Sequence, residues 1–266
     1  MMLSTMKHSA RIFFRFLQRD LFVCRAAIPR YIVNNVLILP LLLVFSEGYI
    51  TQITLFGSNA GLNTMRFVGS LLLPLLTLTF TLSTPLLYDF EYTRFIDYQI
   101  TVLNPRLVLF ERIVFNTLFT FVFMAPFYPF AKLLLGAKFV TTTTSWPMLF
   151  VILLLASFTA SSYHILAMCV LPHAGNFIRL WARISTPLFL LGGFAIPWTI
   201  VKEVSPPIAY VLLGNPFMYI SEGIRQAILG GPLFFPLSLC ISMLILTNII
   251  LYSAALWFFK RRLDHI

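Results

Sequence analysis

Apolar residues recur along this chain in runs long enough to cross a bilayer, separated by shorter, more polar connections. A helix needs about 20 mostly apolar residues to span the hydrocarbon core, because that core is about 30 Å thick and each residue rises about 1.5 Å. Pro126 and Pro129 predict a kink near the far end of the third run. The pattern predicts an all-α integral membrane protein with six spans, at about 31–49, 67–88, 107–135, 148–171, 180–201 and 236–259.

The segment before the first predicted span is amphipathic. Arg11, Arg15 and Arg19 recur every four residues and therefore share one face of a helix, while Phe13 and Phe16 belong to its apolar remainder. An Arg-rich and Phe-rich helix of this kind lies flat at a membrane surface, and docking to a partner is the alternative. We divide the chain into an interfacial segment, 1–30, and a membrane domain, 31–266.

Composition agrees with this division. Of the 266 residues, 59% are hydrophobic and 11% are charged, which leaves no room for a second, soluble domain of ordinary size. The net charge of +10 does not indicate nucleic-acid binding, because the basic residues flank apolar runs and suit orientation and lipid phosphate contacts. Cys24, Cys169 and Cys240 lie far apart and form no CxxC motif, so we expect neither a metal site nor a redox motif.

The distribution of basic residues predicts the orientation of the chain. Cytosolic segments of membrane proteins carry an excess of Lys and Arg. If the N-terminus is cytosolic, 14 of the 19 Lys and Arg residues lie on the inner side, including the group Lys260, Arg261 and Arg262 near the C-terminus. We therefore expect both termini in the cytosol and the spans in the plasma (inner) membrane.

The inner connection at about 88–106, with the sequence YDFEYTRFIDYQITVLNPR, is the most distinctive of the loops. It places Asp89, Glu91, Arg94 and Asp97 among aromatic residues, which a simple tether would not need. We expect a short amphipathic helix along the membrane, with these charged groups facing the cytosol.

The outer connection at about 203–235 predicts a second short helix. Asn215 followed by Pro216 is a helix-start signal, and Gly230 begins the matching stop. The roughly 13 residues between them span about 20 Å, too short to cross a bilayer, so we expect a re-entrant or surface-lying element. Within it Glu222 and Arg225 are i,i+3 neighbours that can pair. The pair could gate the outer exit or fix the re-entrant turn, and we favour the alternative of a structural ion pair at the headgroup level.

Polar side chains also share helix faces within three predicted spans, and they are candidates for a cargo path or for hydrogen bonds between helices. We favour the hydrogen bonds, and we expect no acidic residue inside the spans that would let His164 relay protons. The candidates are Thr77, Thr81 and Thr84; Asn116 and Thr120; and Ser157, Ser161 and His164.

These features together resemble the permease subunits of type-2 ABC exporters. The likeness covers nearly the whole chain and includes the order of the spans, the interfacial helix, the acidic and aromatic inner loop, the basic segment FFKRRL at 258–263, and NPFMYISEGIRQAILGG before the last span. The residues that carry the last motif are Asn215, Pro216, Tyr219, Glu222, Arg225 and Gly230. One departure is that Thr93–Arg94 stands where the family often has Gly-Thr, which weakens any detailed transfer of the contacts made by this loop.

The resemblance implies that two permease chains pair, as a homodimer, and that each docks a separate ATPase subunit. Asp89, Glu91, Arg94 and Asp97 would form the docking surface, and Mg-ATP would bind the partner. The chain itself lacks the GxxxxGK[ST] phosphate loop, so we expect no cofactor on it. The cargo of such a permease is not defined by these residues.

Two other classes remain as alternatives. A secondary carrier or channel would more often place ion-coupling charges inside its spans. A membrane-embedded enzyme acting on lipid or glycan would need a polar catalytic cluster, and neither HExxH nor GxSxG occurs. We therefore expect no catalytic residues on this chain.

Overall fold

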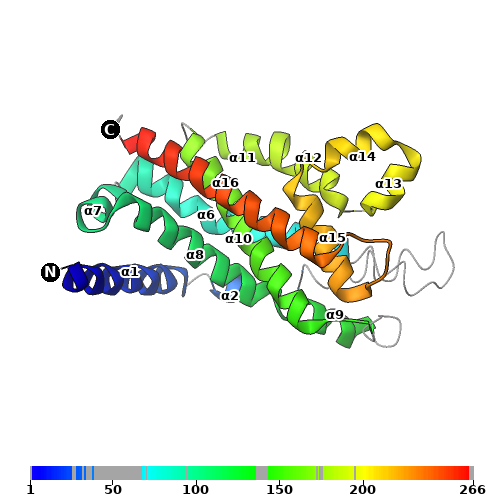
Figure 1. Ribbon diagram of the computed structural model, residues 1–266. Coiled ribbons are helices and arrows are strands. Elements are labelled where there is room, and N and C mark those ends of the chain that lie inside the picture. The colour runs from blue at the N-terminus through cyan, green and yellow to red at the C-terminus, as the bar shows by residue number, and fades with distance from the viewer. Residues whose placement is uncertain are drawn as a thin grey trace.

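The computed structural model describes residues 2–25, 28–31, 33, 38, 68–69, 71–93, 95–135, 143–171, 173, 176–194 and 196–263. Throughout these residues the ordered elements are helices (Figure 1). The predicted span at 31–49 lies almost wholly outside them, as does Arg94. The six-span count therefore stays a prediction.

Among the residues that the structure describes, four helices are long and apolar enough to cross a membrane. They begin with α6 (Leu72–Tyr88), which continues through the π-helical turn η3 (Asp89–Thr93). The others are α8 (Pro105–Met124), which the short α9 (Phe127–Leu135) extends, α10 (Trp146–Val170) and α16 (Leu237–Leu263). They correspond to the predicted spans two, three, four and six. The third is interrupted by a turn at residues 125–126, at the predicted proline position.

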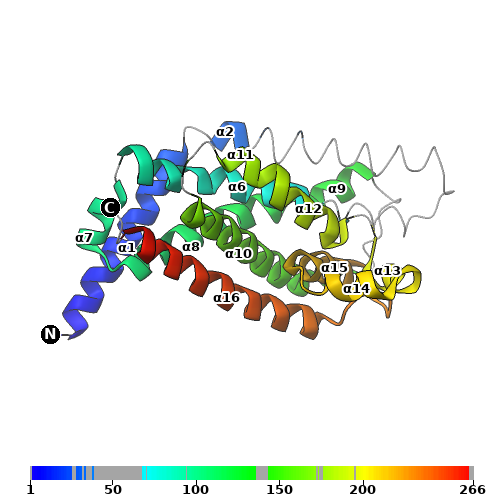
Figure 2. The ribbon, with the colours of Figure 1, turned by 90° about the horizontal axis from the view of Figure 1, so that it is seen from above.

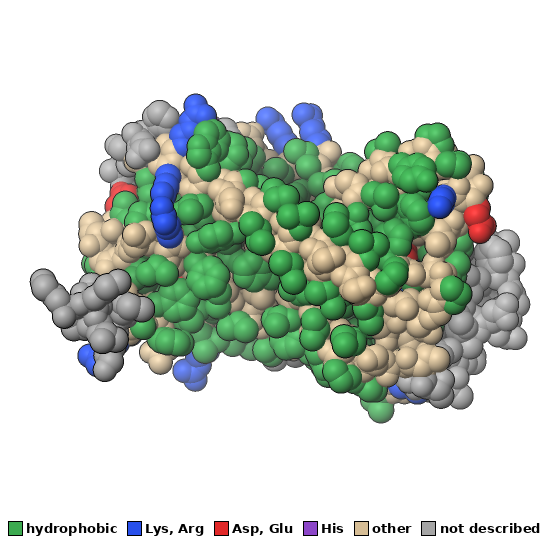
Figure 3. Space-filling model, viewed as in Figure 1, with side chains coloured by type: hydrophobic (Ala, Val, Ile, Leu, Met, Phe, Trp, Pro, Cys, Tyr) green, Lys and Arg blue, Asp and Glu red, His purple; other side chains and the backbone are tan. Residues whose placement is uncertain are grey.

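Helix α10 is the centre of the bundle, packing against α6, α8, α16 and the short α15 (Pro216–Leu229). In α16 only 22% of the most apolar window is buried, against 61% in each of the other three long helices, so α16 lies at the periphery. Hydrophobic side chains dominate the face drawn in Figure 3, where Lys and Arg gather mainly toward the end that carries α7. An apolar outer surface of this kind suits a lipid environment.

The fifth predicted span differs from expectation, because it is not one straight helix. It consists of α11 (Phe177–Leu180), η6 (Trp181–Ser185), α12 (Thr186–Phe189) and η7 (Leu190–Phe194), and then, after a break, α13 (Trp198–Val204). The two arms meet at 89°. Gly193 has a φ of 78° and Pro197 follows the break, so the backbone here cannot continue the helical hydrogen-bond ladder. Helix α14 (Pro206–Leu212) packs beside α13.

Two groups of elements mark the ends of the molecule. The N-terminal helix α1 (Met2–Arg25), the loop helix α7 (Phe95–Val102) and the end of α16 lie together at one end, which we call the α7 end (Figures 1 and 2). Helices α13 and α14 lie at the opposite end. A four-residue helix, α2 (Ile28–Tyr31), follows α1. Helices are present where the sequence predicts the interfacial helix and the loop helix, and α1 begins nearer the N-terminus than the predicted pattern. Their position at a membrane surface stays a prediction.

Candidate functional site

The α7 end is built around one buried guanidinium, that of Arg112, two turns into α8. Its Nη1 donates to Asp20 Oδ2 of α1 at 2.9 Å. Its Nη2 donates to Asp89 Oδ2 of η3 at 2.6 Å and to Gln99 Oε1 of α7 at 3.1 Å. A single side chain thus joins the N-terminal helix and both parts of the loop to a long apolar helix. We call Arg112, Asp20, Asp89 and Gln99 the Arg112 cluster.

The Arg112 cluster is an arrangement of buried charges, and such charges are costly unless they are paired and hydrogen-bonded. Burial raises the pKa of Asp20, and the neighbouring Arg112 and Arg19 oppose that rise. Glu111 lies fully buried beside the cluster, with Oε2 at 3.8 Å from Arg112 Nε, and its carboxylate accepts no hydrogen bond from the described residues. Three carboxylates lie near this guanidinium, so loss of Arg112 would remove the ion pair that it makes with Asp89 and leave Asp20 paired with Arg19.

The structure corrects the expectation that all the charged residues of the loop face outward. Asp89 is buried and points to Arg112, so its carboxylate is an internal anchor. Glu91 and Asp97 are partly exposed, and Glu91 Oε1 lies 3.9 Å from His173 Nδ1. Tyr92 and Tyr98 are exposed on the same loop. The accessible surface of the loop therefore combines two carboxylates with two tyrosines.

The basic end of α16 is also tied to this loop. Arg262 Nη1 donates to the carbonyl oxygens of Met168 and Leu171 at 2.7 and 2.8 Å, which satisfies the last carbonyls of α10. Its guanidinium lies 4.2 Å from the ring centroid of Phe90 in η3. Helices α10 and α16 and the loop are thus linked at the α7 end.

A second polar cluster lies in the half of the molecule nearer α13 and is centred on α15. The predicted limits of this helix are confirmed: Asn215 Oδ1 accepts from Phe217 N at 3.1 Å, Pro216 is its first residue, and Gly230 ends it with a φ of 65°. The helix is not surface-lying, because residues 217–225 are all buried. Asn215 Nδ2 also donates to Leu188 O of α12 at 2.7 Å, so the cap holds α15 against the broken fifth element.

The predicted Glu222–Arg225 pair is present, and it bridges the break in that fifth element. Arg225 Nη1 lies 3.3 Å from Glu222 Oε1, and both side chains are 0% exposed. Arg225 Nη2 donates to the carbonyl oxygens of Gly193 and Phe194, where the first arm ends. Glu222 Oε1 accepts from Trp198 N at 3.1 Å, where the second arm begins. The pair satisfies backbone groups that the break leaves without helical partners.

Close approach of α15 to the break requires small residues. A Cβ on Gly193 would lie 2.5 Å from Ser221 Oγ, and one on Gly192 would lie 2.6 Å from Phe217 Cβ. Ser221 Oγ donates to Gly192 O at 2.7 Å. Tyr219, another residue of the predicted motif, donates to Leu213 O at 2.8 Å. The five predicted outer residues thus belong to one helix whose polar groups hold neighbouring backbone.

The candidate path residues do not form one continuous set. Thr77 is half-buried and Thr81 is exposed. The hydroxyls of both residues, and that of Thr84, donate to carbonyl oxygens of their own helix. A neighbouring face of α6, different from the predicted one, contacts the polar residues of the other spans.

That face carries Thr79 and Ser83. Thr79 Oγ1 lies 2.9 Å from His164 Nδ1, and Ser83 Oγ accepts from Asn116 Nδ2 at 3.0 Å. Ser157 donates to Leu153 O at 2.8 Å. The buried hydroxyls of Thr120 and Ser161 have no hydrogen-bond partner in the part of the chain that the structure describes.

No group of three or more His, Cys, Asp or Glu side chains that could hold a metal ion occurs among the described residues. Comparison of the chain with protein-family models, curated proteins and solved structures gives no match.

Proposed function

We propose that this chain is the permease subunit of a type-2 ABC exporter in the plasma membrane, acting as a homodimer with two separate ATPase subunits. The observation that carries the proposal is the form of the η3–α7 loop. Asp89 and Gln99 fix it to Arg112 from within, while Tyr92 and Tyr98 are exposed beside the partly exposed carboxylates Glu91 and Asp97. Exposed aromatics on a rigid support are typical of protein interfaces.

In this proposal the ATPase docks at the α7 end, on the cytosolic side together with both termini. A displacement of the η3–α7 loop reaches α8 and α1 through Arg112, and it reaches α10 and α16 through Arg262, whose guanidinium contacts Phe90 of η3. At the other end, the Glu222–Arg225 pair holds the break in the fifth element and is the point that would rearrange on outward opening. The chain supplies the path and the coupling, and its partner supplies Mg-ATP hydrolysis.

Co-purification tests the proposal. The tagged chain, extracted from its native membranes in a mild detergent, should carry a vanadate-sensitive ATPase activity. The double variant Glu91→Lys and Asp97→Lys should insert normally but lose that activity and transport. Glu203→Lys, an exposed charge reversal on α13 at the opposite end, is the matched control and should retain both. Full ATPase recovery with the double variant would contradict the docking assignment, and uphill transport by the chain alone in vesicles would contradict the whole proposal.

One observation favours the secondary carrier as a second candidate. The expectation that no acidic residue lies inside the spans is wrong, because Glu111 and Arg112 are both buried within α8. Buried ionisable groups in a span are typical of ion-coupled transport. An ion gradient without ATP should then drive uptake into vesicles, and Glu111→Gln should abolish it. The exporter proposal expects no such gradient-driven uptake.

A further inference from the structure

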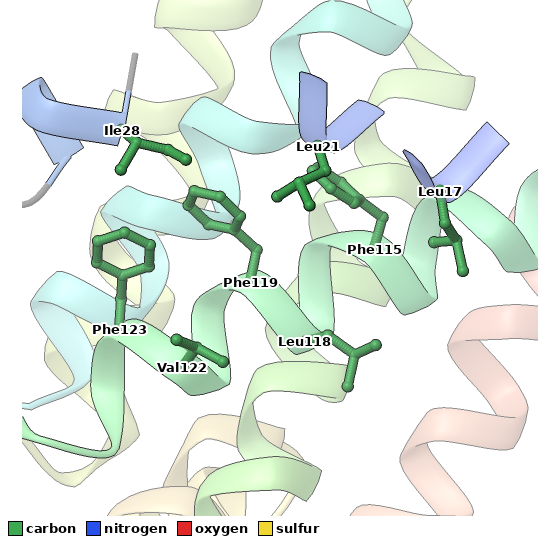
Figure 4. Close-up of a pocket in the computed structure, with 8 residues that line it drawn as sticks. All are labelled: Leu17, Leu21, Ile28, Phe115, Leu118, Phe119, Val122 and Phe123. Atoms are coloured by element: carbon green, nitrogen blue, oxygen red, sulfur yellow. The ribbon is translucent and has the colours of Figure 1, made fainter. Parts of the chain in front are cut away.

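An apolar groove of about 450 Å³ lies between α1, α2 and α8. Its volume falls within the range of roughly 300–1,000 Å³ that is typical of small-molecule sites. In Figure 4 the rings of Phe115 and Phe119 extend from α8 toward α1 and α2. The lining residues among those that the structure describes are apolar, and they include Leu17 and Leu21 of α1, Ile28 of α2, and Leu118, Val122 and Phe123 of α8.

The groove has a polar neighbour. A smaller cavity of about 80 Å³ is lined in part by Arg19, Asp20 and Arg112, and Phe115 lines both spaces. The Asp20–Arg112 bond holds α1 against α8 where the two spaces meet. The charges of this smaller cavity are already paired with one another, so an amphiphile whose chain entered the groove would need another basic residue of α1 for its headgroup.

The charge of α1 selects the kind of amphiphile. The helix carries five basic residues and one acidic residue, Asp20, which is already paired with Arg112. Arg25 follows Leu21 by four residues, so it lies on the same helix face as Leu17 and Leu21, and it is exposed. Phe14 and Phe22 are also exposed, as expected for a helix at the boundary between headgroups and acyl chains. Basic residues at that depth attract anionic headgroups.

We propose that the groove binds an anionic phospholipid, with one acyl chain between α1 and α8 and the phosphate at Arg25. The bound chain fills a space that α1 and α8 leave between them, and it therefore stabilises the docked position of α1 by linkage. This site does not depend on the proposed transport function, because it rests only on the groove and on the charge of α1.

The test uses the full-length chain, delipidated in detergent and titrated by native mass spectrometry. The probes are phosphatidylglycerol and phosphatidylcholine with identical acyl chains. Phosphatidylglycerol should bind about fivefold more tightly or better, because one basic residue near an anionic lipid contributes about that factor. Arg25→Gln should remove this preference, while Arg183→Gln, an exposed charge on η6, should preserve it.

Filling the groove provides the second arm. Leu118→Trp should weaken phosphatidylglycerol binding at least tenfold, and Leu246→Trp on α16 should leave it unchanged. The two leucines are matched, since each is 50% exposed, and only Leu118 lines the groove. Val122→Trp repeats the test at a second lining position. Wild-type binding in both groove variants, or equal binding of the two lipids, would overturn the proposal.

Discussion

Arg112 and Asp20 are 92 positions apart in the chain, yet Nη1 of the one lies 2.9 Å from Oδ2 of the other. This contact joins the N-terminal helix to a long apolar helix beside the loop helix α7. The same part of α1 also touches α7 directly, because the Arg19 guanidinium lies 3.7 Å from the ring centroid of Phe95 and Phe16 packs edge-on against that ring. Helices α1 and α7 therefore form one packed unit on α8, so a force applied to α7 acts on α1 as well.

Replacing Asp20 by Asn should loosen α1 and expose Cys24. Burial, together with the Asp20 carboxylate, raises the pKa of the Cys24 thiol to about 11, so the reactive thiolate is scarce near neutral pH. Asp20→Asn removes the nearby negative charge and weakens the bond to Arg112. Each unit by which the Cys24 pKa falls should raise the rate of maleimide labelling about tenfold.

Labelling is measured near pH 7.5 in a variant that retains Cys24 as its only cysteine. Arg15→Gln, an exposed change on the same helix, should label at the wild-type rate. An unchanged rate in Asp20→Asn would show that Asp20 does not hold α1 in place.

Replacing Arg112 by Gln should destabilise the protein strongly. Removing one partner of a buried ion pair costs about 3–5 kcal/mol, because the remaining charge stays buried without compensation. Arg112→Lys should fall between Gln and wild type, since a single ammonium cannot reproduce the fork that reaches Asp20, Asp89 and Gln99. Unfolding in mixed micelles measures the effect, with Arg183→Gln as the exposed control. Equal stability of all four proteins would show that the Arg112 cluster makes no net contribution to the free energy of unfolding.

The parts of this fold that could be predicted from sequence are those that local signals determine. Asn215 and Pro216 determine where α15 begins, and Gly230 determines where it ends. The pairing of Glu222 with Arg225 follows from their i,i+3 spacing on this helix. The long apolar helices follow from bilayer thickness in the same way.

The Arg112 cluster could not be predicted in the same way, because its partners are far apart in sequence. Arg112 is one of the 14 inner basic residues whose distribution predicts orientation, and Glu111 beside it inside an apolar run is the one local signal of a buried polar site. The bend in the fifth element has a local signal too, in Gly192–Gly193 and Pro197, but hydrophobicity is continuous across these residues and predicts a single span. The face of α6 that meets His164 could not be chosen, since threonines and a serine occupy more than one face of that helix.

Replacing Asn215 by Ala should cost more than replacing Asn104 by Ala. Both residues cap a helix that begins with Pro, and loss of such a cap costs about 1 kcal/mol. Asn215 is buried and also donates to Leu188 O, so its loss removes a second hydrogen bond, to a partly buried carbonyl, and adds about 1 kcal/mol. Asn104 is exposed, and among the described residues its side chain makes the cap bond alone. Comparable unfolding curves for the two variants would contradict the role of Asn215 in holding the break.

Replacing Gly193 by Ala should destabilise the break in the fifth element through two separable effects. The φ of 78° costs a non-glycine residue about 1–2 kcal/mol, and the new Cβ would lie 2.5 Å from Ser221 Oγ, which forces α15 away from η7. Gly231→Ala isolates the first effect, because its φ is 92° and nothing lies within 4 Å of the added Cβ. Gly214→Ala has neither a positive φ nor a contact closer than 3.4 Å and should be nearly neutral. The unfolding midpoint should therefore be highest for Gly214→Ala, lower for Gly231→Ala and lowest for Gly193→Ala. Equal midpoints for Gly193→Ala and Gly231→Ala would show that α15 does not pack tightly against the break.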